Sequence, residues 1–292
     1  MSLRILVLGV SGMIGNGIYD VLSRDDNLEV FGTLRSKDLY KDLQKKENLI
    51  TGINALDQQS WEKVLIEYKP NVVINCVGIT KHIETTTNKN ISINLNSIFP
   101  HKLVSVCNKI SSRLIHISTD CVFSGRKGFY SEADLPDADD LYGITKSLGE
   151  INSKEHLTLR TSTIGHEPYS QNGLLEWFLS QEKKCKGFKN AIFSGVSTQE
   201  LGVILRDKIL LNDRIGGLYH LSSEPISKFD LLNLFKKYYS KDILIEEDKD
   251  FKIDRSLDGK KLNEAINYKS EGWDVMINRM MNSKLEKKIV QK

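Results

Sequence analysis

The stretch "RILVLGVSGMIGNGIYDVL" constrains the fold most, because it joins an apolar β-type run to an amphipathic helical pattern through closely spaced glycines. Gly9, Gly12 and Gly15 stand between the two patterns. Glycines at such a turn let backbone N–H groups approach a pyrophosphate at the positive end of a helix. The stretch therefore predicts a dinucleotide site beside the first strand of a parallel sheet, although a tight turn without a ligand would also need glycines.

Short apolar runs alternate with amphipathic stretches through the first half of the chain. Strands are expected at Arg4–Leu8, Leu28–Leu34, Leu49–Ile53, Asn71–Val77, Arg113–Ser118 and Leu157–Arg160, and helices at Met13–Ser23, Gln58–Tyr68, Asn90–Ile110 and Leu141–Lys154. Unbroken runs such as "NVVIN" are typical of strands buried on both faces. The pattern predicts an α/β fold with a doubly wound parallel (Rossmann) sheet.

The alternation of strand-like and helix-like patterns is less regular in the second part of the chain. The segments "GVSTQELGVILRDKIL" and "ISKFDLLNLFKKYYS" read as capped helices, and "GGLYHLSS" reads as a strand that rejoins the sheet. With 292 residues, the chain suits one large domain and a smaller interleaved α/β lobe. We expect a dinucleotide-binding domain at 1–166 and 197–222, and a substrate lobe at 167–196 and 223–292.

Composition excludes several classes of function. Lys and Arg number 41 against 38 Asp and Glu, a balance that argues against a nucleic-acid partner. The four cysteines show neither CxxC spacing nor the framework of a small secreted domain, which indicates reduced thiols in the cytoplasm. No apolar run approaches membrane-spanning length. The six histidines are scattered without an HExxH motif, so we expect no metal site.

The residues after the second expected strand, "GTLRSK", bear on the choice of cofactor. An acidic residue there would hydrogen-bond a ribose hydroxyl, whereas a cation accommodates a 2′-phosphate. Arg35, with Ser36 and Lys37 beside it, favours NADPH. NADH stays an alternative cofactor, because an ordinary surface arginine would look the same. The small residues of "NCVG", which ends the fourth expected strand, suit a chain that passes close to a ribose or nicotinamide, although core packing explains Cys76 and Val77 equally well.

The stretch "DLYGITKSLGE" places Tyr142 and Lys146 one helical turn apart on one face. A phenol with a reference pKa near 10 is a poor acid at neutral pH. A nearby ammonium stabilises the phenolate and moves the tyrosine toward useful proton transfer. Thr119 supplies a hydroxyl for the same carbonyl oxygen. A tyrosine and a lysine at this spacing are common by chance. A catalytic role is favoured by the order of the features along the chain, in which the glycine turn, Arg35, Thr119 and then the Tyr142–Lys146 pair follow one another.

That order resembles the extended short-chain dehydrogenase/reductase superfamily over nearly the whole chain. The motifs "GVSGMIG", "STDCVFSG", "YGITKSLGE" and "LRTSTIG" resemble the dTDP-4-dehydrorhamnose reductases and related reductases of nucleotide-activated 4-keto-6-deoxy sugars. The resemblance implies a catalytic set of Thr119, Tyr142 and Lys146, and it places Asn96 at the asparagine of the family's active-site helix. Together with the glycine turn and the strand ends, it gives a cofactor site of Gly9, Ser11, Gly12, Met13, Ile14, Gly15, Arg35, Asn54, Ala55, Cys76, Val77, Gly78 and Thr80, completed by Tyr142 and Lys146. It also implies substrate contacts at Asp120, Cys121, Thr163 and Arg255, with Arg255 at the diphosphate.

The resemblance further implies NADPH-dependent reduction of a sugar-nucleotide ketone in nucleotide-sugar and surface-polysaccharide biosynthesis. Hydride would pass to the C4 ketone, while Tyr142 gives its proton to the developing alkoxide and Thr119 hydrogen-bonds the same oxygen. The expected partner is the sugar-nucleotide substrate, and a homodimer is left open.

Two alternatives stay open. Dehydratases of the superfamily carry Asp-Glu after the catalytic threonine, whereas this chain has Asp120 and Cys121, which favours reduction. GDP-fucose synthases place a cysteine at the position of Cys121 for epimerisation, but they also need a histidine partner, for which His166 is a poor substitute. Thr163 stands where rhamnose-forming reductases carry tryptophan, so the sugar and the base are left undetermined. The other alternative is a non-catalytic NADP-binding regulatory subunit.

Overall fold

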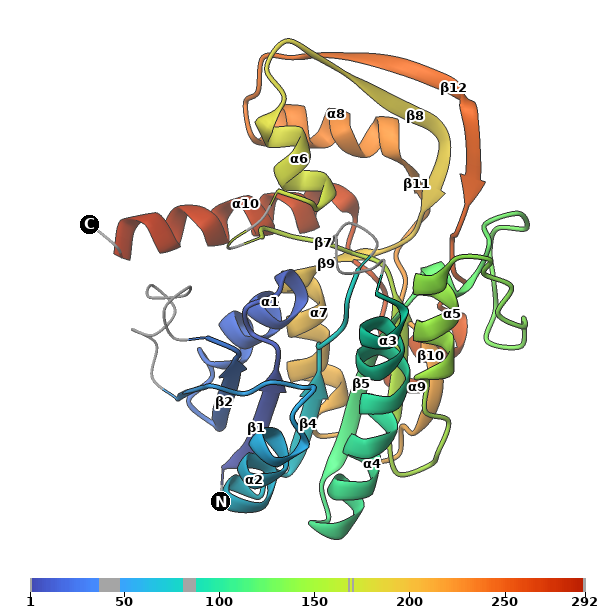
Figure 1. The fold of residues 1–292 in the computed structure, drawn as a ribbon. Coiled ribbons are helices and arrows are strands. Elements are labelled where there is room, and N and C mark those ends of the chain that lie inside the picture. Colours follow the sequence, from blue (N-terminus) through green and yellow to red (C-terminus); the bar gives the residue numbers. More distant parts are fainter. Residues whose placement is uncertain (1, 37–47, 81–87, 168, 170, 291–292) are drawn as a thin grey trace.

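The structure is a computed structural model that describes residues 2–36, 48–80, 88–167, 169 and 171–290 (Figure 1). Its centre is a seven-stranded sheet in the order β10-β6-β5-β4-β1-β2-β3, with all neighbouring strands parallel. The strands are β1 (Leu3–Leu8), β2 (Leu28–Leu34), β3 (Leu49–Thr51), β4 (Val72–Asn75), β5 (Arg113–Thr119), β6 (Leu157–Thr161) and β10 (Gly217–His220). This order confirms the predicted doubly wound fold. It also confirms that "GGLYHLSS" rejoins the sheet, as β10 beside β6.

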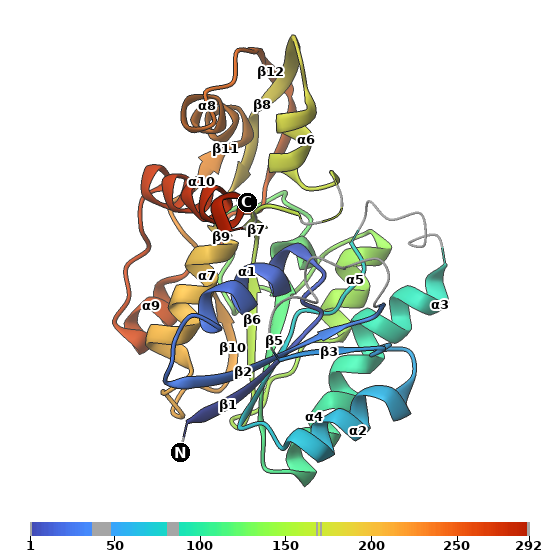
Figure 2. The same ribbon diagram turned by 90° about the vertical axis from the view of Figure 1, so that its left-hand side faces the viewer.

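Helices cover both faces of this sheet (Figure 2). The helices are α1 (Met13–Leu22), α2 (Gln58–Tyr68), α3 (Lys89–Ser92), α4 (Phe99–Lys109), α5 (Leu141–Leu148), α6 (Leu174–Ser180), α7 (Thr198–Ile204), α8 (Lys228–Tyr238), α9 (Lys260–Ile266) and α10 (Trp273–Val290), with π-helices η3 (Ile93–Ile98) and η5 (Leu205–Ile209) and the 3₁₀-helix η4 (Asp120–Val122). Among the described residues, no helix combines the length and apolar character needed to cross a bilayer.

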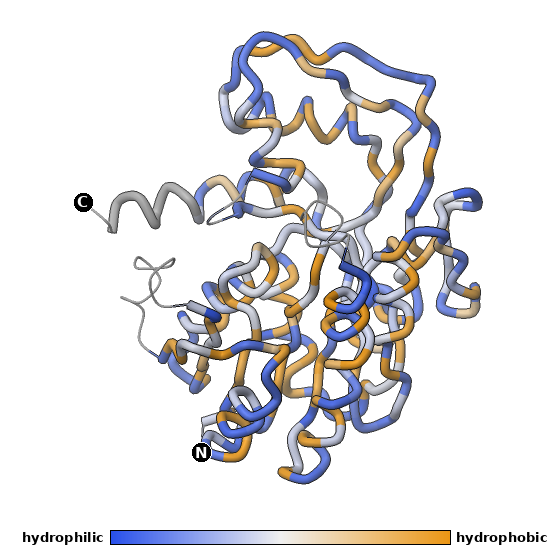
Figure 3. Tube along the Cα trace, viewed as in Figure 1, coloured by the Kyte–Doolittle hydropathy of each residue, from blue (hydrophilic) through white to orange (hydrophobic). Residues whose placement is uncertain are grey.

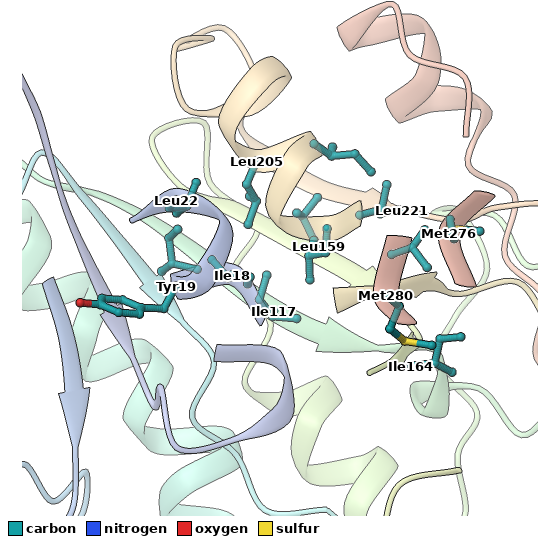
Figure 4. Packing of buried hydrophobic residues seen from close by; sticks show 14 of the residues in the cluster. Ile18, Tyr19, Leu22, Ile117, Leu159, Ile164, Leu205, Leu221, Met276 and Met280 are labelled. Carbon is teal, nitrogen blue, oxygen red and sulfur yellow. The ribbon is translucent and has the colours of Figure 1, made fainter. Parts of the chain in front are cut away.

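Alternate residues of the strands point to two separate cores. Ile5 and Val7 of β1 join the core beneath α1 and α7, whereas Leu6 and Leu8 join the core beneath α2 and α4. Figure 4 shows the first core, where Ile18 of α1 lies near Ile117 of β5. The hydropathy colouring has the same distribution, with apolar strands inside and polar segments around them (Figure 3). Burial on both faces explains the continuous apolar runs in the sequence.

A second, three-stranded sheet forms the upper part of the molecule in Figure 1. Its order is β11-β8-β12, from β11 (Ile226–Ser227), β8 (Lys184–Phe193) and β12 (Leu244–Asp254). Helix α8 packs against β8, and α6 packs against α8. A short parallel pair, β7 (Thr163–Ile164) and β9 (Val196–Ser197), lies between the two sheets in sequence and in space. The two-part domain division stays a prediction.

Several expected boundaries were wrong. The helix expected at Asn90–Ile110 is divided into α3, the π-helix η3 and α4. Helix α5 ends at Leu148 rather than Lys154, with Gly149 as its C-cap. Gly149 packs so closely on η3 that a Cβ there would overlap the Asn96 carbonyl oxygen. The fourth strand ends at Asn75, whose side chain accepts a hydrogen bond from the Val77 N–H at 3.0 Å.

Candidate active site

The carboxyl ends of the parallel strands bring together the segments that carry the predicted site. The strand order reverses between β1 and β4, and crevices outside such a reversal are the usual ligand sites of doubly wound sheets. The glycine turn follows β1, the "NCVG" stretch follows β4, and the "STDC" stretch ends β5. The candidate site is therefore built on one edge of the sheet.

The glycine turn has the conformation that a pyrophosphate site needs. Gly9 has φ +84°, a left-handed value, and its carbonyl accepts the Gly12 N–H at 3.0 Å. A Cβ on Gly15 would overlap the Gly9 carbonyl oxygen, so the first turn of α1 can lie directly on the loop. Helix α1 begins without a side-chain cap and without an acidic residue in its first turn. Its amino end thus suits an anion, which fits a dinucleotide.

The other predicted cofactor residues follow the ends of neighbouring strands. Ser11, Met13 and Ile14 are half-buried around the glycine turn. Arg35 is exposed immediately after β2, and Lys37 lies outside the described residues. The remaining cofactor predictions follow β3 or β4 and are Asn54, Ala55, Cys76, Val77, Gly78 and Thr80. Their assignment to a cofactor stays a proposal.

Thr119 and Tyr142 meet at the carboxyl end of β5. Burial raises the pKa of the Tyr142 phenol, and the Thr119 side chain acts against this rise. The nearby Cys121 and Asp120 raise it further. Asp140 caps α5 by accepting the Gly143 N–H at 2.8 Å, and thereby sets Tyr142 at the start of the helix. The phenol is therefore held as a protonated acid.

Lys146 lies one turn further along α5 and is buried. Its Nζ donates to the Ile117 carbonyl at 2.8 Å, on the strand beneath the helix. Burial lowers the pKa of Lys146 to about 8, while the Glu150 carboxylate and Cys76 oppose that shift. The ammonium is charged at neutral pH. To reach the ribose of a cofactor, it would have to give up its hydrogen bond to the Ile117 carbonyl.

Asp120, Cys121 and Arg255 form a polar group beside Thr119. Thr119 Oγ1 donates to Asp120 Oδ1 at 3.1 Å and accepts the Cys121 N–H at 3.1 Å. Burial raises the pKa of the Asp120 carboxyl, and the charge of Arg255 acts against this shift. Arg255 Nη1 lies 3.7 Å from Cys121 Sγ, and its Nε donates to the Phe123 carbonyl at 2.9 Å. Arg255 thus adjoins the reacting end of the site.

Thr163 and His166 lie on the segment after β6. Thr163 is half-buried and pairs with Val196 of β9. His166 contacts Glu176 Oε1 through Nδ1 at 2.6 Å and the Tyr239 hydroxyl through Nε2 at 2.8 Å. Both ring nitrogens are therefore engaged within the upper part of the molecule. This arrangement gives no support to His166 as the partner of Cys121 in an epimerisation.

Sequence reasoning missed a buried ion pair beneath the site. Arg160 of β6 donates to both carboxylate oxygens of Glu150, at 2.8 and 2.7 Å, and Ser118 donates to the same carboxylate at 2.7 Å. The side chains of Arg160 and Glu150 are only 3% and 10% exposed. Both residues lie within motifs that carried the resemblance, "LRTSTIG" and "YGITKSLGE". The sequence alone does not show that these two residues pair with each other.

Asn96 and His116 also have roles that sequence spacing does not reveal. Asn96 in η3 bonds the Ile79 backbone in both directions, at 2.9 and 3.2 Å, and also donates to Thr145 Oγ1 at 3.1 Å. It thereby joins the segment after β4 to α5. His116 is completely buried in β5, where Asn75 Nδ2 contacts its Nδ1 at 3.1 Å. The described residues contain no group of three or more His, Cys, Asp or Glu side chains arranged for a metal ion.

The fold and the glycine turn define a dinucleotide-binding protein of the extended short-chain dehydrogenase/reductase class. Comparison with known proteins gives the family. The profile described as "RmlD substrate binding domain" matches residues 3–241, and the chain belongs to this family. The predicted resemblance is thereby confirmed.

Individual relatives are more distant. The chain is 26% identical over 249 residues to the dTDP-4-dehydrorhamnose reductase of Aggregatibacter actinomycetemcomitans, which covers 78% of this chain and 76% of that protein. It is also 26% identical over 148 residues to methionine adenosyltransferase 2 subunit beta of Bos taurus, covering 50% of this chain and 41% of the relative. The match spans less than half the length of the first curated relatives.

A solved structure agrees with the fold along nearly the whole chain. The dTDP-4-dehydrorhamnose reductase of Bacillus anthracis, in complex with NADP, superposes with a TM-score of 0.79 at 19% identity, covering 97% of this chain and 99% of that one. At this identity the likeness supports the fold alone.

Proposed function

We propose that this protein is an NADPH-dependent reductase of a nucleotide-activated 4-keto-6-deoxy sugar, acting in nucleotide-sugar and polysaccharide biosynthesis. The observation that carries the proposal is that Thr119, at the end of β5, and Tyr142, at the start of α5, lie on two elements in contact at the edge of the sheet that also bears the glycine turn. Membership of the family and the similarity to a dTDP-4-dehydrorhamnose reductase support it.

Each residue of the proposed site has a separate role in the reduction. Gly9–Gly15 and Arg35 would hold a nicotinamide cofactor, which would supply the hydride. Tyr142 donates its proton to the ketone oxygen as negative charge develops there, and Thr119 hydrogen-bonds the same oxygen. Lys146, one turn further along α5, carries the positive charge that would stabilise the phenolate that remains.

The test is NADPH oxidation, followed by absorbance, with a panel of CDP-, GDP-, UDP- and dTDP-linked 4-keto-6-deoxy sugars. Tyr142→Phe abolishes turnover and leaves NADPH affinity nearly intact, because the ring stays and only the proton donor is lost. Tyr68→Phe is the matched control, since Tyr68 lies at the far end of α2 with its ring 4.8 Å from Phe31. A Tyr142→Phe enzyme with the wild-type rate would show that another group is the acid.

The same assay separates the two alternatives. Binding of NADPH without turnover of any sugar in the panel would support a regulatory subunit, the class to which the similarity with a methionine adenosyltransferase beta subunit points. Reaction in deuterated water tests epimerisation, because label at C3 or C5 of the product requires proton abstraction from carbon. We expect label at neither position, since His166 is held by Glu176 and Tyr239.

The proposal extends to location and assembly. The four cysteines are free thiols, as in a cytoplasmic protein. Ile93 and Ile98 of η3 and Ile144 and Leu148 of α5 are exposed apolar side chains on two helices in contact. We assign this face to a second copy of the chain, because a twofold dimer needs one self-complementary patch. Sedimentation should give a dimer that Leu148→Asp converts to a monomer; a wild-type monomer would refute it.

A further inference from the structure

The end of β12 is fastened to the loop that follows η4 in the sequence (Figure 1). Arg255 is the first residue after β12. On one side of it, the Asp254 N–H donates to the Gly125 carbonyl of the loop at 2.8 Å. On the other side, the Ser256 carbonyl accepts the Tyr130 N–H of the same loop at 2.9 Å. The backbone is therefore held to the loop both before and after Arg255.

The side chain of Arg255 is held by the same part of the chain. Its Nε donates to the Phe123 carbonyl at 2.9 Å, and its Nη1 lies 3.7 Å from Cys121 Sγ. Phe123 is the residue directly after η4, the 3₁₀-helix that Thr119 caps. The segment that presents the Thr119 hydroxyl thus also sets the direction of the guanidinium.

Tyr130 fixes the shape of this loop from inside. Its side chain is buried, and its hydroxyl oxygen accepts the backbone N–H groups of Gly125 and Lys127, both at 3.1 Å. Its ring stacks on the ring of Phe123, with centroids 4.1 Å apart and planes 9° from parallel. One side chain therefore holds both residues whose carbonyls fasten Arg255, because the Phe123 carbonyl binds its side chain and the Gly125 carbonyl binds the N–H before it.

We propose that Tyr130 is a positioning residue that holds the Arg255 guanidinium in the orientation that binds the diphosphate of the nucleotide-activated sugar. This role rests on the proposed function, since the sugar nucleotide carries the diphosphate. A guanidinium gives two parallel hydrogen bonds to phosphate oxygens only when its plane is correctly oriented. Nε is used by the Phe123 carbonyl, so the two Nη groups are the donors that a diphosphate would meet. Tyr130 is only 2% exposed and acts through Arg255.

Calorimetry with dTDP, UDP, GDP and CDP tests this role without turnover. We expect at least one of the four to bind the wild-type protein. Tyr130→Phe should weaken that binding about tenfold, because two loop N–H groups lose their acceptor and the guanidinium loses its alignment. The glycine turn follows β1, two strands away from β5, so NADPH affinity should stay within about twofold. Tyr268→Phe is the matched control, since it removes a hydroxyl that donates to Glu200 at 2.8 Å, and it should leave nucleotide affinity unchanged.

A double-variant cycle distinguishes positioning of Arg255 from a general structural role. In the Arg255→Lys background, Tyr130→Phe should change nucleotide affinity by less than about twofold, because an ammonium has no plane to orient. In the NADPH oxidation assay, Tyr130→Phe should raise KM and keep kcat within about twofold, since the diphosphate is unchanged by the reaction. Independent, multiplicative losses in the cycle would overturn the proposal. A lower kcat at unchanged KM would do the same.

Nuclear magnetic resonance of the wild-type protein provides a measurement that needs no variant of Tyr130. The Arg255 Nε–H signal, assigned from its loss in Arg255→Lys, should exchange slowly with water because the Phe123 carbonyl accepts it. A rapidly exchanging signal would contradict the proposal, as would wild-type affinity in Tyr130→Phe or the absence of binding for all four nucleotides. Failure of the proposed function has a different result, in which a nucleotide binds but no sugar of the panel leads to NADPH oxidation.

Discussion

Replacing Glu150 by glutamine should be among the most destabilising single changes in this protein. The carboxylate receives two bonds from Arg160 and one from Ser118, and both partners of the ion pair are nearly inaccessible to water. A glutamine keeps one oxygen and places an NH₂ group against the other guanidinium nitrogen. One attractive contact thereby becomes a contact between two donors, and the charge of Arg160 is left buried without compensation.

The expected cost follows from this burial. Removing one partner of a buried ion pair costs about 3 to 5 kcal/mol, because the remaining charge keeps its desolvation penalty. Native domains have unfolding free energies of about 5 to 15 kcal/mol, so Glu150→Gln removes a large fraction of the total. Glu150 also raises the pKa of Lys146, which is about 8 in the intact protein. The variant should therefore hold less charge on Lys146 at neutral pH and react more slowly.

Urea denaturation followed by circular dichroism measures the effect on stability. Arg160→Met keeps an unbranched chain over the Phe123 ring, which the guanidinium approaches to 5.0 Å. The double variant Glu150→Gln/Arg160→Met should be less destabilised than the sum of the single variants by at least about 2 kcal/mol, since no buried charge is left unpaired.

An exposed pair of the same protein provides the control. The side chains of Lys184 and Glu246 pair at 3.1 Å but are 66% and 42% exposed. Glu246→Gln should change the unfolding free energy by less than about 1 kcal/mol. A cost below about 1 kcal/mol for Glu150→Gln, or simple additivity in the double variant, would refute the reasoning, because it would mean that water reaches the Glu150–Arg160 pair.

Two further predictions concern cofactor choice and pH. Arg35→Ala should weaken NADPH binding by about 10- to 100-fold in calorimetry and leave NADH binding nearly unchanged, because only NADPH carries the phosphate; equal losses would contradict the cofactor assignment. Burial lowers the pKa of His220 to about 4, so the unfolded chain binds the extra proton first as the pH falls below about 6.5. His220 alone should lower the unfolding free energy by about 2 to 3 kcal/mol between about pH 7 and pH 4.5, so the decline in His220→Gln should be smaller by about that amount. An identical decline in the two proteins would exclude His220 as the source.

The Rossmann sheet could be predicted because its strands are buried on both faces, which leaves uninterrupted apolar runs in the sequence. The second sheet could not. Strand β12 reads "LIEEDKDFKID" and is largely exposed, and its register against β8 shifts between Asp248 and Lys252. Charge on a solvent-facing strand removes the alternation that marks a half-buried one. The pairing with β8 is decided by tertiary contacts that local sequence does not encode.

The π-helix η3 escaped prediction for a related reason. Nothing in "INLNSI" distinguishes a π-turn from an α-turn. The wider turn is maintained by contacts from outside, since Asn96 bonds the Ile79 backbone and Ser97 donates to the Thr145 carbonyl at 2.8 Å. The Asn96 carbonyl of the same π-helix leaves no room for a Cβ at position 149, where α5 has its C-cap. Helix spacing correctly placed Tyr142 and Lys146 on α5, but the partners of Lys146 come from the strand beneath it.

The "STDC" stretch brings together, at the end of β5, polar side chains that a continued strand would place on opposite faces of the sheet. Side chains alternate between the faces of a sheet, so a continued strand would turn Asp120 away from Thr119 and Cys121. The chain instead enters the 3₁₀-helix η4, with Thr119 as its cap. The turn stops the alternation, so that the Thr119 hydroxyl lies 3.1 Å from both the Asp120 carboxylate and the Cys121 backbone nitrogen. Three polar side chains that are consecutive in the sequence are thereby gathered at the end of β5 instead of being divided between the two faces of the sheet.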